Sequence, residues 1–171
     1  MISDSDNIDS YLDSIIADSN NVISYQKEMK VAALLISVGK HQEAIRHFEE
    51  AHQMLMELKD DPDYDKLYFG NSLRYAWCLE YLGDLTKAEE MYLEALPGGG
   101  LAIGDYANFL HRKKSDFTLA KRYYKMAIDL FPSHSSLHLK YAGFLRHIEK
   151  DLVGAEHHYK LAVETNPSNS G

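Results

Sequence analysis

The sequence predicts an all-α protein built from repeated pairs of antiparallel helices, and three observations support this fold class. The first is a set of four residues that recurs after 35 positions. These residues are Ala120, Tyr124, Ala127 and Pro132, which return as Ala155, Tyr159, Ala162 and Pro167. A period between about 20 and 50 residues is typical of stacked repeats. Second, apolar residues recur at helical spacing, and no segment alternates as a strand would. Third, the four prolines largely avoid the predicted helices.

The same Ala-aromatic-Ala pattern occurs twice upstream, which predicts four repeats in total. The upstream copies are Ala44, Phe48 and Ala51, then Ala88, Tyr92 and Ala95. An apolar helical stretch precedes each copy, over Met29–Val38, Leu73–Leu82, Ile103–Leu110 and Leu137–Ile148. Each repeat is therefore predicted to contain two helices. The predicted repeats cover residues 25–60, 66–97, 101–133 and 136–167 of one domain over 22–167.

A tight turn is predicted between the two helices of each repeat. Gly39 and Gly83 suit the left-handed position that ends many helices, because glycine has no Cβ to clash there. Asp84, Asp116 and Asp151 suit the first position of the following helix. A carboxylate at that position accepts hydrogen bonds from the free backbone N–H groups of the first turn.

The spacing of the repeats is uneven at two places. Ala44 and Ala88 are 44 residues apart, and we expect the surplus to lengthen the second helix of repeat one before a turn that contains Pro62. Ala88 and Ala120 are only 32 apart, and residues 97–100 between them read Pro-Gly-Gly-Gly. Two interpretations of these glycines stay open, a tight bend or a hinge between repeats two and three.

Composition narrows the class of protein. The chain has 171 residues, a net charge of −8 and a single cysteine, Cys78, which excludes an internal disulfide framework. No apolar run approaches 18 residues, so we expect an intracellular protein away from the membrane, cytoplasmic by default, with the nucleus not excluded. The charge is spread unevenly and concentrated positive charge is lacking, which argues against a nucleic-acid partner.

Residues 1–21 lie outside the repeats and predict a short acidic amphipathic helix. Residues 1–24 contain five Asp and no Lys or Arg, and Ile8, Leu12 and Ile15 recur at helical spacing. Two roles stay open for this segment: a cap over the first repeat, or a detachable segment that competes for a binding groove. Residues 168–171 form a short tail.

The four helix pairs resemble the tetratricopeptide repeat family over roughly residues 25–167. That family has a helix–turn–helix unit of 34 residues with Ala, an aromatic residue and Pro at late positions. The four copies match these positions, whereas the early Trp of the family is missing from each copy. The resemblance implies a right-handed superhelical solenoid in which the first helices line a concave groove. It also implies a non-catalytic adaptor for a peptide of another protein.

By position, the resemblance implies that aromatic and basic side chains line this groove. The predicted peptide-binding residues are Arg74, Trp77, Tyr81, Tyr106, Phe109, Arg112, Lys113, Lys140, Tyr141 and Phe144. Aromatic and Arg side chains are the usual anchors of interfaces, and Arg holds carboxylates with a planar fork. We therefore expect a protein or peptide ligand with acidic and apolar side chains. The alternatives are that Trp77 and Phe109 pack between helices, and that Arg74 and Arg112 are solvated charges.

One branch of the family binds the C-terminal tails of chaperones through a clamp of Lys, Asn and Arg side chains. The corresponding positions here are Met29, Ala33, Arg74, Ala102 and Tyr106. Because the clamp residues are replaced, we do not expect chaperone tails to bind by that mechanism.

No catalytic or metal-binding constellation is evident, so we expect neither an enzyme nor a cofactor. Cys78 lies in an apolar helical stretch beside Trp77 and is expected to be a buried, inert thiol. The nine histidines include no zinc-protease motif. A zinc site needs three or four converging ligands, so the histidines are expected to be surface or partly buried residues.

Stacked repeats usually end in a cap with a polar outer face, which shields the last repeat from solvent. No further helix follows Pro167 in this sequence, so we expect an apolar strip to be left uncovered on the fourth repeat. The strip would contain Leu139, Leu145, Leu152 and Leu161. Three explanations stay open: the chain is a fragment, it self-associates end to end, or the outer face is polar enough. A structural subunit that self-associates or docks through this repeat is therefore the alternative to the groove-binding adaptor.

Overall fold

The computed structural model describes residues 24–57, 59 and 63–165, and every regular element in these ranges is a helix. The elements are α2 (Ser24–Ser37), α3 (His41–Met56), α4 (Tyr64–Leu82), α5 (Leu85–Ala95), η1 (Leu96–Gly98), α6 (Gly100–Phe109), η2 (Leu110–Lys114), α7 (Phe117–Leu130), α8 (Ser135–Phe144), η3 (Leu145–Glu149) and α9 (Leu152–Thr165). The all-α prediction is confirmed. The predicted N-terminal helix, the turn at Pro62 and the tail lie outside the described residues.

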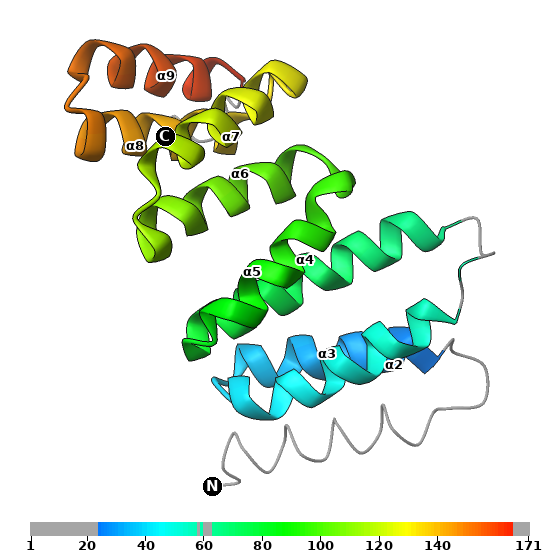
Figure 1. Cartoon of the computed structure of the whole chain (residues 1–171). Coiled ribbons are helices and arrows are strands. Elements are labelled where there is room, and N and C mark those ends of the chain that lie inside the picture. Colours follow the sequence, from blue (N-terminus) through cyan, green and yellow to red (C-terminus); the bar gives the residue numbers. More distant parts are fainter. Residues whose placement is uncertain (1–23, 58, 60–62, 166–171) are drawn as a thin grey trace, which may run out of the picture. The chain divides into compact units, whose positions relative to one another are not determined.

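The chain divides into two compact units, unit 1 over Met1–Met91 and unit 2 over Tyr92–Gly171. In unit 1, α2 packs on α3, and α3 packs on α4. In unit 2, α6 packs on α7, α7 on α8, and α8 on α9. Figure 1 shows the antiparallel course of α2 and α3 and of α8 and α9.

The alanines of the repeat pattern are the points where helices approach closely. All eight expose 4% or less of their surface: Ala44, Ala51, Ala88, Ala95, Ala120, Ala127, Ala155 and Ala162. The aromatic residue between each pair of alanines is buried in the first three repeats, as Phe48, Tyr92 and Tyr124. In the fourth repeat its counterpart, Tyr159, is only partly buried. The core of the first three repeats therefore includes a residue that the fourth leaves partly uncovered.

The predicted turn chemistry is confirmed. Gly39 and Gly83 have φ angles of 80° and 88°, in the left-handed region. The Oδ1 atoms of Asp84, Asp116 and Asp151 each accept a hydrogen bond from the backbone N–H three residues further on, at 3.2, 3.0 and 2.9 Å. These aspartates therefore begin α5, α7 and α9 as predicted.

The first helices of unit 2 end differently from those of unit 1. Both α6 and α8 widen into a π-helical turn, η2 and η3, and end at Ser115 and Lys150 with φ angles of 56° and 59°. The backbone N–H of Asp116 donates to the carbonyl of Leu110, six residues back, at 3.1 Å. The turn of unit 2 therefore holds one residue more than the glycine turn of unit 1.

The surplus residues between the first two repeats lengthen α3, as expected, and also α4. With 16 residues, α3 is longer than the other second helices α5, α7 and α9, which have 11, 14 and 14 residues, and α4 has 19 residues and begins at Tyr64. Leu67 and Tyr68 of this extension pack on a cluster formed by Tyr25 and Leu55. Apolar contacts with α2 and α3 thus account for the longer helix.

The glycines before α6 form a close contact. Gly99 has a φ of 99°, and a Cβ on Gly100 would lie 2.3 Å from Cδ2 of Phe131. Of the two interpretations of this segment, the tight bend fits these contacts, because Gly100 is buried against a ring that leaves no room for a side chain.

Candidate functional site

An apolar groove of about 330 Å³ lies on unit 1 among α2, α3 and α4. Its α4 wall consists of Arg74, Trp77, Cys78 and Tyr81, at the i, i+3, i+4 and i+7 positions of one helix face. Trp77 is 46% exposed and Tyr81 is 70% exposed. The ring of His41 stacks on Tyr81 with centroids 3.9 Å apart. Two large aromatic side chains are therefore available at this surface.

A second groove of about 460 Å³ shares Arg74 with the first and has a cationic lining. Lys30 of α2 and Lys66 and Arg74 of α4 line it, and its lining includes no acidic residue. We call the two grooves together the α2–α4 groove. Arg74 is exposed. The positive charge of this groove is not balanced by a carboxylate in its own lining.

Asn71 is the buried polar group of the α2–α4 groove. Its side chain is 1% exposed, and its amide nitrogen donates to Nδ1 of His52 at 3.4 Å. Its Oδ1 atom has no hydrogen-bond partner among the described residues. An unsatisfied buried acceptor is costly, and this oxygen is closed off from the groove surface because almost none of it is accessible.

The predicted aromatic anchors of unit 2 are buried, which corrects the expectation that they contact a ligand directly. Tyr106 and Tyr141 are 3% and 5% exposed, and Phe109 and Phe144 are fully buried. Phe109 packs on Tyr92, with centroids 5.0 Å apart. Phe144 and Tyr141 pack on Tyr124 in the same way. The open alternative for Phe109, packing between helices, is what the structure contains.

The predicted basic residues of unit 2 have different surroundings. Arg112 and Lys113 are exposed in the η2 turn. Lys140 of α8 forms an ion pair with the buried carboxylate of Asp105 on α6. Because Asp105 already balances its charge, Lys140 holds α6 and α8 together rather than offering a free cation.

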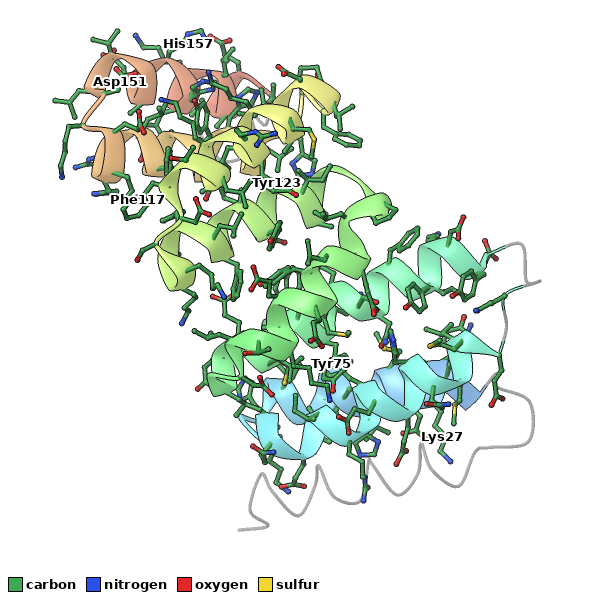
Figure 2. All side chains as sticks on the ribbon, in the orientation of Figure 1. Lys27, Tyr75, Phe117, Tyr123, Asp151 and His157 are labelled. Carbon is green, nitrogen blue, oxygen red and sulfur yellow. The ribbon has the colours of Figure 1, made fainter. Side chains whose placement is uncertain are left out.

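The side chains of unit 1 that carry potentially reactive groups take part in hydrogen bonds that join its helices. Burial raises the pKa of the Cys78 thiol to about 11, and its Sγ donates to the carbonyl of His41 at 3.4 Å. Tyr75, labelled in Figure 2, donates to Oε1 of Glu49 at 2.7 Å, and Lys87 binds the same oxygen. Hydrogen bonds from Lys87 and Tyr75 lower the pKa of Glu49. This network joins α3, α4 and α5 of unit 1.

Three potential metal ligands converge on unit 1, although the sequence suggested none. Ligand atoms of Glu28, His47 and Glu50 lie within 4.8 Å of one another. Each is already engaged, because His47 Nδ1 lies 2.6 Å from Glu28 Oε2 and Glu50 lies 3.6 Å from Arg46. The hydrogen bond between His47 and Glu28 joins α2 and α3, and the pair of Arg46 and Glu50 lies within α3, so the cluster is explained by helix contacts.

The predicted apolar strip of the fourth repeat is only partly exposed. Leu139 and Leu152 are 46% and 67% exposed, whereas Leu145 is 5% exposed and therefore part of the core. Val163 on α9 is also 51% exposed. Within the described ranges, no helix combines the length and the apolar character that crossing a bilayer requires.

The sequence pattern located α4 but missed part of its groove. Lys66 and Asn71 lie in the N-terminal part of α4, before Leu73, where the apolar stretch of repeat two was expected to begin. The acidic run before residue 64 hid this part of the helix, because it marks a turn. No sequence signal marks His41 as part of the groove, because its ring reaches Tyr81 only through the packing of α3 on α4.

Comparison with solved structures places this arrangement among known helical repeats. The chain is similar to the Cut9–Hcn1 hetero-tetramer of the APC/C, with a TM-score of 0.73 and 16% identity over 95% of this chain and 29% of that chain. It is similar to a Podospora anserina putative kinesin light chain with nearly identical TPR-like repeats, with a TM-score of 0.66 and 11% identity over 93% and 85%. It is also similar to YrrB, a TPR protein with an unusual peptide-binding site, with a TM-score of 0.58 and 17% identity over 92% and 76%.

No family model matches the chain, and no curated protein matches it. The chain spans less than a third of the Cut9–Hcn1 chain that it matches. At 11 to 17% identity, these similarities concern the fold.

Proposed function

Because the chain has the tetratricopeptide-repeat fold, we propose that it is a non-catalytic adaptor that binds a peptide segment of another protein in the α2–α4 groove. The peptide carries an apolar or aromatic side chain for the end lined by Trp77 and Tyr81. It carries acidic side chains for the end lined by Lys30, Lys66 and Arg74.

The observation that carries this proposal is the exposure of Trp77 beside Arg74. Trp and Arg dominate interface hot spots, and Trp77 is 46% exposed beside the exposed Arg74. Arg74 has no hydrogen bond or ion pair with another described residue, so its guanidinium is available to a carboxylate. The exposed ring and the available cation line one groove.

Selection from a random 12-residue peptide library tests this function. Peptides that bind the whole chain would be counter-selected on Arg74→Glu, and the survivors titrated while the fluorescence of Trp77, the only tryptophan, is followed. We expect enrichment of acidic and aromatic residues and a change in Trp emission. Removing one hot-spot side chain should weaken binding by about 10-fold or more.

Arg122→Glu on α7 is the matched control, because it makes the same charge change at an exposed site on unit 2. Peptides that bind both variants equally, with no response of Trp77, would exclude the α2–α4 groove as their site. A selection that yields no peptide dependent on Arg74 would contradict the adaptor function.

A second function, docking into a larger assembly through the fourth repeat, is favoured by the exposed apolar residues Leu152 and Val163 of α9. Exposed apolar patches often mark association sites. Sedimentation of the chain alone and with its co-purifying partner tests this function. If Val163→Asp leaves the sedimentation mass unchanged in both samples, this function is contradicted.

A further inference from the structure

We propose that the outer face of α9 binds an amphipathic helix of a partner protein with aromatic residues three positions apart and a basic residue five positions after the second. This inference rests on the second function above and specifies the chemistry of the partner. It depends on an internal comparison: α7 and α9 follow the same sequence pattern 35 residues apart, and the structure contains the helix that covers α7.

The face of α7 that corresponds to this site is covered by α8. Tyr124 of α7 is fully buried, and its ring lies 5.7 Å from that of Tyr141 and 5.5 Å from that of Phe144. Ala142 between these two residues is also fully buried. The covering helix thus presents two aromatic rings, three positions apart, on either side of a small residue.

Among residues 24–57, 59 and 63–165, no helix covers the same face of α9. Tyr159, the counterpart of Tyr124, is only partly buried and lines a groove of about 600 Å³. The lining residues are Arg146, Leu152, Ala155, Glu156, Tyr159, Lys160, Val163 and Glu164. An aromatic pair spaced like Tyr141 and Phe144 would cover Tyr159 in the way that α8 covers Tyr124.

A second correspondence concerns the aromatic ring of the ligand. In unit 2 the ring of His111 contacts that of Phe144, with centroids 5.6 Å apart. The residue 35 positions after His111 is Arg146, which lines the open groove. A guanidinium favours the face of an aromatic ring, so the second aromatic residue of the partner suits this position.

The charge expected on the partner helix follows from a change of sign at one position, which is basic in the third repeat and acidic in the fourth. Lys121 of α7 forms an ion pair with Glu149, at the end of the helix that covers it, at 2.5 Å. The residue 35 positions after Lys121 is Glu156. A partner helix in the same register must therefore carry Lys or Arg where this chain carries Glu149. Lys160 lies 2.7 Å from Glu156, but both side chains are about two-thirds exposed, so their interaction is weak.

The acidic N-terminal segment does not meet this requirement, because residues 1–24 contain no Lys or Arg. A helix of opposite charge character does. We therefore assign the face to a basic and aromatic helix rather than to this segment of the chain.

A peptide with the sequence of residues 135–149 provides the probe, because it contains Tyr141, Phe144 and Glu149 in the required spacing. Two labelled versions, wild type and Glu149→Lys, would carry a side-chain cross-link so that both are helical by circular dichroism. Fluorescence anisotropy would measure their binding to the whole chain. We expect the Lys version to bind about fivefold more tightly, the effect of one partly exposed ion pair.

Changes in the protein then identify the face. Glu156→Lys should reverse the preference between the two peptides. Tyr159→Asp and Val163→Asp should each weaken both peptides by about 10-fold or more. Val153→Asp is the matched control, because Val153 is 81% exposed on the same helix and does not line the groove.

Three results would overturn the inference. Equal binding of the two peptides, or a preference that Glu156→Lys leaves unchanged, would remove the predicted charge pairing. A dimer of the chain that Tyr159→Asp converts to a monomer would assign the face to a second copy. Absence of binding by either helical peptide, together with a mass unaffected by Val163→Asp, would contradict the second function itself. None of these results bears on peptide binding by unit 1.

Discussion

The first helices of the two units use the same kind of residue in opposite ways. In unit 1, α4 leaves Trp77 and Tyr81 open to solvent, 46% and 70% exposed. In unit 2, α6 and α8 bury the aromatic residues that the family resemblance placed on the groove, including Phe109 and Phe144. Each of these buried rings packs on the tyrosine of a preceding second helix, Tyr92 or Tyr124.

This difference follows from the register of the repeats. The carbonyls of Leu79, Leu110 and Leu145 accept the hydrogen bond that closes each turn, so these leucines occupy equivalent positions. Counting back from them, Phe109 and Phe144 correspond to Cys78, and all three are buried. Trp77 and Tyr81 lie at other positions of the helix and remain exposed, so an aromatic residue must be placed in the repeat register before it is assigned to a binding surface.

The largest expected effect comes from truncating an aromatic residue in each unit. Phe109→Ala should lower the free energy of unfolding by about 3 to 5 kcal/mol, because it leaves a cavity in a buried cluster. Trp77→Ala should cost less than about 1 kcal/mol, because its ring is half exposed. Urea unfolding followed by circular dichroism measures both changes. Equal losses in the two variants would break the comparison between the units.

A smaller effect is expected at the turns. Gly83→Ala in unit 1 should destabilise by about 1 to 2 kcal/mol, since φ is 88° there and alanine disfavours the left-handed region. Lys150→Gly in unit 2, where φ is 59°, should stabilise by up to about 1 kcal/mol for the same reason. Thermal unfolding of the two variants measures both changes. Gly143→Ala in α8 is the control, because a Cβ at this position would have no atom within 4 Å. A stabilising Gly83→Ala would contradict the role of the left-handed turn.

The smallest effect concerns pH, and it should differ between the units. Burial, with His138 and His157 nearby, lowers the pKa of His158. The folded unit 2 therefore binds fewer protons than the unfolded chain below the ordinary pKa of about 6.5, so its stability falls as pH drops from 7 toward 5. In unit 1 the lowered pKa of Glu49 contributes stability that is present above about pH 4.3 and is lost only as pH falls through the lower value.

The contact between His138 and His158 gives this effect a geometric cause. His138 Nε2 donates to the carbonyl of Pro132 at 2.8 Å, so Nδ1 of the neutral ring accepts from Nδ1 of His158 at 3.0 Å. If both rings were protonated, the Nδ1–H groups of His138 and His158 would point at each other, and the hydrogen bond between the rings would be lost. Urea unfolding at pH 7 and pH 5 should therefore give a smaller difference for His158→Phe than for the wild-type chain. An unchanged difference would exclude His158 as the source.

Much of the fold could be predicted from the sequence, because its signals are local. Gly39 and Gly83 mark turns through their backbone freedom, and Asp116 and Asp151 mark helix starts through their carboxylates. The repeat alanines mark close packing because no larger side chain fits. The π-helical turns at Leu110–Lys114 and Leu145–Glu149 could not be predicted, since they add one residue without any glycine or proline to mark them.

The candidate site was harder to predict, because it depends on which side of a helix meets a neighbour. Trp77 and Phe109 carry the same expectation in the sequence, but the turn hydrogen bonds place Phe109 at the position of the buried Cys78, one residue after Trp77. Likewise, the charge of Lys140 is offset by Asp105, a contact between helices that are far apart along the chain.

The ion pair between Asp105 and Lys140 has a consequence for how such an array can evolve. The two residues occupy equivalent positions in consecutive repeats, 35 residues apart. Tandem duplication of repeat three would place one aspartate against another, and duplication of repeat four would oppose two lysines. The third and fourth repeats are therefore not interchangeable, and lengthening the array by copying either one requires a compensating change of charge.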